Sequence, residues 1–263
     1  MKINTTETPA TRRCAEIAYA GDYRGWVRPG WTRSCVLGSV AAMTIAAVIS
    51  VVVSAYLAQY RSGTYKVVAV ELVAMASVVE GALIGYFQWR VLRRLFPTMS
   101  SGYWVGATMI AAGSGCLLSW LPTSFALTAA LAGRIGDAAP EPIVIVRVSL
   151  VTGALVGLVW GVAQHAVLRL HAHRAGSWIL ASITAWATSF VCLYLAAFLP
   201  DRTNSPLIHI ALGALAGLVL GLTLGLLQGR VLAELHSRLL ASSHAEGVEE
   251  SAEHRRRLQN YFR

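Results

Sequence analysis

Charged residues are scarce in this chain, and that scarcity excludes a water-soluble globular protein. Only 13% of the 263 residues are charged and 56% are hydrophobic, whereas an ordinary soluble domain carries about 25% charged residues. Small residues dominate the apolar stretches, and the chain has 23 glycines. Small residues suit helices that pack closely in lipid. The composition therefore predicts an integral membrane protein.

Recognised catalytic motifs are missing as well. The sequence has no H-E-x-x-H, P-loop, Rossmann glycine pattern or G-x-S-x-G turn. Its four cysteines form no C-x-x-C pair. His165, His171 and His173 lie close together, but their spacing is poor for one metal ion, and we interpret them as a basic interfacial cluster. We predict a protein that is not an enzyme and has no cofactor or metal.

Six apolar stretches are each long enough to cross a bilayer, which takes about 20 helical residues. Their apolar character is continuous rather than alternating, which favours helices over strands. The predicted spans are 35–59, 67–89, 103–122, 143–168, 177–199 and 207–229. The predicted fold is an all-α transmembrane bundle over residues 35–230, with a cytoplasmic or interfacial segment at 1–34 and a cytoplasmic tail at 231–263.

Basic residues are distributed unevenly over the connections between these spans. Of the 22 lysines and arginines, seventeen lie on one side, and the opposite connections hold only Arg61, Lys66, Arg134 and Arg202. Because basic residues in short loops stay cytoplasmic, both termini are predicted inside the cell. The basic ends are expected to attract anionic lipid. Other membrane proteins or a second copy are further candidate partners, and nucleic acid is not expected because no nucleic-acid motif is present.

One pattern, G-x-x-x-G-x-x-Q-x-x-V-L, occurs in the second, fourth and sixth predicted spans. Its glycines and glutamines are Gly81, Gly85 and Gln88, then Gly157, Gly161 and Gln164, then Gly221, Gly225 and Gln228. A weaker mark opens the other three spans: Gly30 with Trp31, Gly102 with Trp104, and Gly176 with Trp178. We therefore predict three tandem helical hairpins, at about 30–95, 102–170 and 176–235.

The spacing of this pattern predicts how the helices pack. Glycines four residues apart lie on one helix face and allow a close approach, as in a glycine zipper. The three glycine-bearing helices run parallel, so we expect them to pack together around a pseudo-threefold axis, with the first, third and fifth spans facing lipid. We interpret the three glutamines as interhelical hydrogen-bonding groups, with a polar ring at a pore mouth as the alternative.

Residues 81–93 read G-A-L-I-G-Y-F-Q-W-R-V-L-R. This segment resembles a motif in a group of uncharacterised bacterial multispanning membrane proteins, where G-x-x-x-G-x-x-Q-W-x-V-L-R segments recur and a helix led by Gly and Trp follows. The resemblance covers about residues 30–232, although His165 and Gly229 replace the tryptophan in the second and third copies. It implies a bacterial membrane protein, placed in the cytoplasmic (inner) membrane, and carries no known activity.

Glu80 is the acidic residue predicted near the middle of the bilayer. Glu71 and Arg147 lie near the outer ends of their spans and can reach the interface. A carboxylate at the depth of Glu80 costs about 2.5 to 3.5 kcal/mol on insertion scales, so it should face the bundle as the neutral acid. We interpret it as an interhelical clasp, for instance to Thr152 or Thr223, with a proton or cation site as the alternative.

Two functions are compatible with these features. The first is a structural or accessory membrane component, which the absence of other intramembrane charge favours. The second is a small proton- or ion-coupled transporter or channel that uses Glu80. A water-filled cavity at Glu80 would favour the second, and a dry bundle the first, because function depends on the site rather than on the fold.

Overall fold

The computed structural model describes residues 9–57, 65–129, 142–172, 175–198 and 205–261, and most of these residues are helical. The six helices are α1 (Pro9–Leu57), α2 (Tyr65–Leu95), α3 (Ser101–Ala129), α4 (Pro142–Leu168), α5 (Ser177–Phe198) and α6 (Pro206–Tyr261). These described ranges contain no strand. The predicted all-α class is therefore confirmed.

Within the described residues, four of the helices are long and apolar enough to cross a membrane. The segments are Val27–Val53, Val146–Leu168, Ser177–Tyr194 and Pro206–Arg238. Large apolar side chains such as Leu37, Ile110 and Leu180 lie on the outside of the bundle. Because so much exposed apolar surface is stable in lipid and not in water, the chain is an integral membrane protein. The predicted spans in α2 and α3 include side chains outside the described residues, so the count of six stays a prediction.

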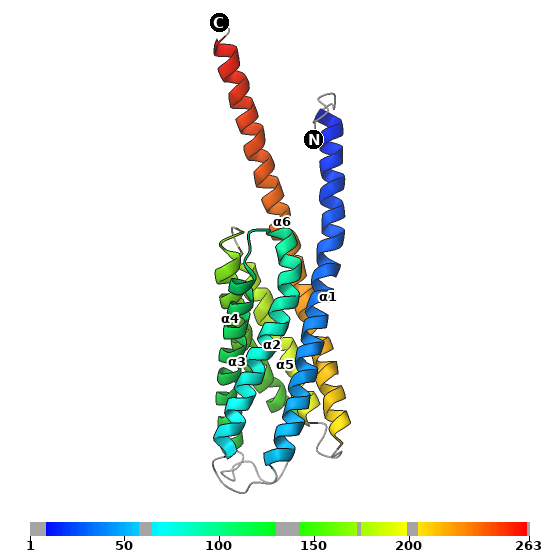
Figure 1. The fold of residues 1–263 in the computed structure, drawn as a ribbon, viewed down its shortest axis with the longest axis vertical. Helices are drawn as coiled ribbons and strands as arrows, with labels where there is room; N and C mark the ends of the chain where they lie inside the picture. The colour runs from blue at the N-terminus through cyan, green and yellow to red at the C-terminus, as the bar shows by residue number, and fades with distance from the viewer. Residues whose placement is uncertain (1–8, 58–64, 130–141, 173–174, 199–204, 262–263) are drawn as a thin grey trace.

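The helices form a closed ring. Each helix packs against the next in chain order, and α6 returns to pack against α1. Figure 1 shows the first part of α1 and the last part of α6 projecting beyond the bundle at one end, which also carries the α2–α3 connection. The predicted core of α2, α4 and α6 is wrong, because within the described residues these helices do not pack along one another and the odd-numbered helices lie between them.

The glycine rows explain the order of the ring. Each row lies against the odd-numbered helix that comes next, and not against another glycine row. A Cβ added to Gly81 would lie 2.7 Å from the carbonyl oxygen of Thr108 in α3, and one added to Gly157 would lie 2.7 Å from that of Ser182 in α5. Any side chain at these positions would force the backbones apart, so glycine is what allows the two helices to touch.

The row on α6 lies against α1 in the same way. A Cβ at Gly221 would meet the Cα atom of Val36 and lie 2.8 Å from the carbonyl oxygen of Cys35. At Gly217 the added atom would lie 2.5 Å from the carbonyl oxygen of Ser39. We call the three glycine contacts, α2 on α3, α4 on α5 and α6 on α1, the glycine seams.

The three seams share one register. The residues whose carbonyl oxygens face Gly81, Gly157 and Gly221 each come four positions after the tryptophan that opens their helix. The tryptophans are Trp104, Trp178 and Trp31, and the facing residues are Thr108, Ser182 and Cys35. Equivalent sequence positions therefore make equivalent contacts around the ring.

Candidate functional site

A layer of buried polar and aromatic side chains crosses the bundle toward the end that carries the projecting helix termini. All of its side chains are fully buried. The layer consists of Gln88, Gln164, Gln228, Trp31, Trp104 and Trp178. The ring of Trp178 meets those of Trp31 and Trp104 edge-on, at centroid distances of 5.5 and 6.0 Å. The interior at this level is therefore filled by indole rings, and we call it the Gln–Trp layer.

Gln164 is the centre of the hydrogen bonds in this layer. Its Nε2 donates to Gln88 Oε1 at 2.9 Å and to Thr108 Oγ1 at 3.3 Å. Its Oε1 accepts from Trp178 Nε1 at 3.1 Å. One amide thus connects α4 to α2, α3 and α5, which fixes the positions of four helices relative to one another.

The other two glutamines bond in an equivalent way to the helix that precedes their own. Gln88 Nε2 donates to Cys35 Sγ at 3.7 Å, and Gln228 Nε2 donates to Ser182 Oγ at 3.0 Å. The acceptors are again the residues four positions after the opening tryptophans. Each even-numbered helix is therefore held by glycines on one neighbour and by its glutamine on the other.

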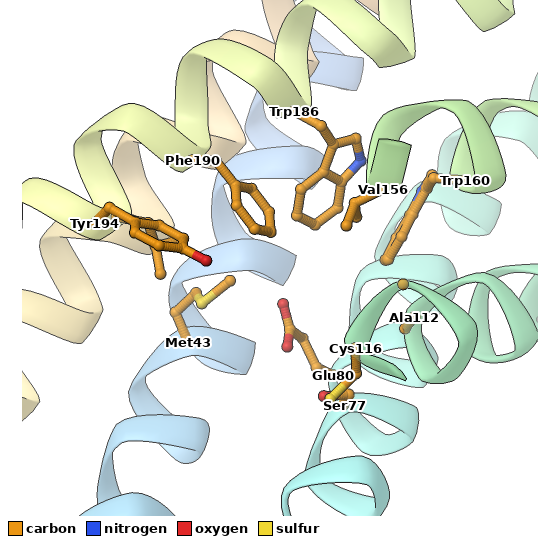
Figure 2. Close-up of a pocket in the computed structure, with 12 residues that line it drawn as sticks. Met43, Ser77, Glu80, Ala112, Cys116, Val156, Trp160, Trp186, Phe190 and Tyr194 are labelled. Atoms are coloured by element: carbon orange, nitrogen blue, oxygen red, sulfur yellow. The ribbon is translucent and has the colours of Figure 1, made fainter. Parts of the chain in front are cut away.

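Beyond the Gln–Trp layer, toward the opposite end of the bundle, the interior contains a partly open cavity of about 280 Å³. Five helices contribute to its wall. They supply Met43 from α1, Ser77 and Glu80 from α2, Cys116 from α3, Trp160 from α4, and Trp186, Phe190 and Tyr194 from α5 (Figure 2). Small residues at Ala112 and Gly115 leave the space that larger side chains would fill.

Glu80 is the acidic group of this cavity. Figure 2 shows its carboxylate directed into the space bounded by Met43, Trp160 and Trp186. No lysine, arginine or histidine is found among the described residues that line the cavity. Among the described residues, no hydrogen bond or ion pair holds the carboxylate. The group therefore faces the cavity, where a proton, water or a bound cation can compensate its charge.

Thr152 and Thr223, the threonines suggested as interhelical hydrogen-bond partners of Glu80, do not bond to it. Thr223 Oγ1 lies 2.6 Å from Ser189 Oγ, and it also bonds to carbonyl oxygens of its own helix. Thr152 Oγ1 is buried and has no hydrogen-bond partner in the described part of the chain. The predicted hydrogen bond between Glu80 and these residues is wrong, because Thr223 bonds to Ser189 and to its own helix and Thr152 bonds to no described residue.

An aromatic wall faces Glu80 across the cavity, and the sequence analysis missed it. The ring centroids are 4.7 Å apart for Trp160 and Trp186, 5.9 Å for Trp186 and Phe190, and 6.0 Å for Phe190 and Tyr194. The last three residues are four positions apart on α5 and share one face. That spacing is the signal that could have identified them.

The remaining polar residues singled out in the sequence lie away from the cavity. Arg147 is exposed on the outside of α4. His171 packs against Phe96 with ring centroids 6.2 Å apart. The side chains of Glu71 and His173 lie outside the described residues. These positions therefore add no group to the candidate site.

The ring of helices, the Gln–Trp layer and the cavity together define the class of protein. It is a helical membrane protein with several spans and an interior cavity that contains a carboxyl group. Comparison of the chain with protein-family models, with curated proteins and with solved structures finds no match. The function has to be argued from the site itself.

Proposed function

We propose that this protein is a small transporter or channel for a cation in the bacterial inner membrane, with Glu80 as the group that contacts the ion. The cavity of about 280 Å³ at Glu80 is the observation that supports this. A carboxyl group within the membrane is costly and normally pairs with another group or faces a polar space. Here it faces a space, which is the condition that favours transport over a purely structural role.

In this proposal the Gln–Trp layer is the barrier on the cytoplasmic side. The distribution of basic residues supports placing the termini, and with them the layer, toward the cytoplasm. The cavity then faces the outside, and a cation reaches Glu80 from there. Passage to the cytoplasm requires the layer to open, which breaks the bonds of Gln164 to its neighbours.

The ring is further proposed to consist of three equivalent units, and the units differ from the hairpins expected from the sequence. The shared register of the seams supports the pairs α2–α3, α4–α5 and α6–α1. In this arrangement α1 and α6 are the two halves of one unit, separated to opposite ends of the chain. Six spans follow from three such units.

The orientation is tested with single cysteines in a variant without native cysteines. Cysteines placed in turn at Ser62, Gly136 and Thr203, which lie outside the described residues, are expected to react in intact cells with a membrane-impermeant thiol reagent. A cysteine at Ser243 should react only after the cells are broken. Labelling of Ser243 in intact cells, with protection of the other three, would reverse the orientation.

Transport is tested with Glu80→Gln in proteoliposomes. The amide keeps the size of the side chain but cannot ionise, so flux should fall to background while the melting temperature in detergent stays near that of the wild type. Flux is measured under imposed gradients with a panel of cations that runs from protons and potassium to small ammonium ions. Glu234→Gln is the matched control, because Glu234 pairs with Arg238 on the exposed surface of α6 and should leave flux unchanged.

A structural or accessory role is the second candidate, and the close packing of the glycine seams and the Gln–Trp layer favours it. Under this alternative the wild-type protein carries no cation of the panel across the membrane, and Glu80→Gln has no effect. That result, or flux that survives in the Gln variant, would remove the transport proposal.

A further inference from the structure

We propose that the cavity binds a small organic monocation of the ammonium class, held between the carboxylate of Glu80 and the aromatic wall formed by Trp160, Trp186, Phe190 and Tyr194. This inference rests on the proposed function, because it names the class of cation that Glu80 contacts. Its charge, its chemical nature and its size follow from separate observations.

The positive charge of the ligand follows from Glu80. The carboxylate is directed into the cavity (Figure 2), and the described residues that line the space include no basic side chain. A single carboxylate in a region of low dielectric is best compensated by a single positive charge. A neutral ligand would leave the ionised form of Glu80 without a counter-charge.

The organic nature of the ligand follows from the rest of the wall. Ca²⁺ takes six to eight oxygen ligands and Mg²⁺ needs a nearly octahedral set. In the part of the chain that the structure describes, the side-chain oxygens of this lining belong to Glu80, Ser77 and Tyr194, which are too few for either ion. Four of the twelve lining residues are aromatic, and an aromatic ring attracts a cation placed within about 6 Å of its centroid.

The aromatic rings are arranged as a continuous surface rather than as isolated side chains. Successive centroids along the wall are 4.7, 5.9 and 6.0 Å apart. A cation lying over this surface would contact more than one ring at once. Met43 lines the same cavity as Glu80 (Figure 2), and its polarisable thioether suits the methyl groups of an alkylammonium ion.

The size of the ligand follows from the cavity. A volume of about 280 Å³ is at the lower limit of ligand pockets, which run from about 300 to 1,000 Å³. The space therefore fits an ammonium ion that carries a few carbon atoms and excludes larger amphiphiles. Tetramethylammonium and choline are suitable probes of this size and charge.

The binding test uses the full chain in a mild non-ionic detergent and isothermal titration calorimetry. Tetramethylammonium and choline are expected to bind, whereas 3,3-dimethylbutan-1-ol, the neutral carbon analogue of choline, should bind at least about tenfold more weakly, a difference of about 1.4 kcal/mol. Glu80→Gln should weaken choline binding by a similar factor. Phe190→Leu should weaken it too, and the control Tyr103→Leu should leave it unchanged, since Tyr103 is 72% exposed and does not line the cavity.

Three outcomes would overturn the inference: no binding of either ammonium ion, equal binding of choline and its neutral analogue, or unchanged choline binding in a folded Glu80→Gln variant. The binding and flux assays separate the two proposals. Choline binding without flux of any cation keeps this inference and overturns the proposed transport. Proton flux that depends on Glu80, without binding of an organic cation, keeps the transport proposal and overturns this inference.

Discussion

Leucine at Gly221 is expected to destabilise the protein by about 3 kcal/mol or more, because an overpacked interface must move its backbones apart. Even a Cβ atom at this position would collide with the backbone of Val36 and lie 2.8 Å from the carbonyl oxygen of Cys35. Both are backbone atoms, so no side chain can rotate away to make room. Gly157→Leu should have a comparable effect, since its Cβ would lie 2.7 Å from the Cα atom of Ile183. The measurement is thermal or denaturant unfolding in a fixed detergent.

Gly106 offers a matched control on α3. A Cβ at this position would have no atom within 4 Å apart from the backbone of its own helix and its two neighbours in the chain. Leucine is a better helix former than glycine by about 0.8 kcal/mol, so Gly106→Leu should leave stability unchanged or raise it slightly. If Gly221→Leu and Gly157→Leu melted at the temperature of the Gly106 variant, the seams would not be close contacts in the folded protein.

Gln164→Met is expected to cost about 2 to 3 kcal/mol, because it leaves two buried groups without partners. Methionine keeps the length and approximate volume of the side chain but forms no amide hydrogen bond. The indole N–H of Trp178 would lose its acceptor, and Gln88 Oε1 would lose its donor. The same measurement of unfolding in detergent detects this loss.

Gln228→Met is the comparison that isolates the hydrogen-bond network. Gln228 donates to Ser182 at 3.0 Å, while its own Oε1 is buried without a partner in the described residues. Its replacement removes one bond and one unsatisfied atom together, so the cost should be about 1 kcal/mol or less. Equal destabilisation by the two variants would show that packing, and not the amide network of Gln164, stabilises this layer.

The fold class was accessible from composition, but the order of helix contacts was not. The spacing of Gly81, Gly157 and Gly221 predicts close helix contacts, and a Cβ atom at each would lie less than 3 Å from a backbone atom of another helix. Their spacing shows that one face of each helix lacks side chains. It does not show which neighbouring helix packs against that face. The short connection between α2 and α3 (residues 96–100) makes these helices antiparallel neighbours. This constraint decides which helix packs against α2, even though the three glycine-bearing helices have similar sequences.

The candidate site was predictable in part for a related reason. Glu80 could be identified because a carboxyl group is conspicuous among apolar residues. The stripe of Trp186, Phe190 and Tyr194 was not identified, because aromatic residues at helical spacing are typical of ordinary packing. It becomes a cavity wall only because small residues, Ala112 and Gly115, occupy the facing helix, and that juxtaposition depends on the order of the ring.

The seam between α1 and α6 has a consequence for biogenesis. It joins residues near 36 to residues near 221, so at 5 to 20 residues per second of synthesis α1 waits on the order of 10 to 40 s for its partner. Until then the membrane contains an incomplete ring of helices, in which the face of α1 that packs against α6 has no partner. The α6 helix of a second nascent chain offers the same glycines to that face. Domain-swapped dimers are therefore the form of misassembly that this topology favours.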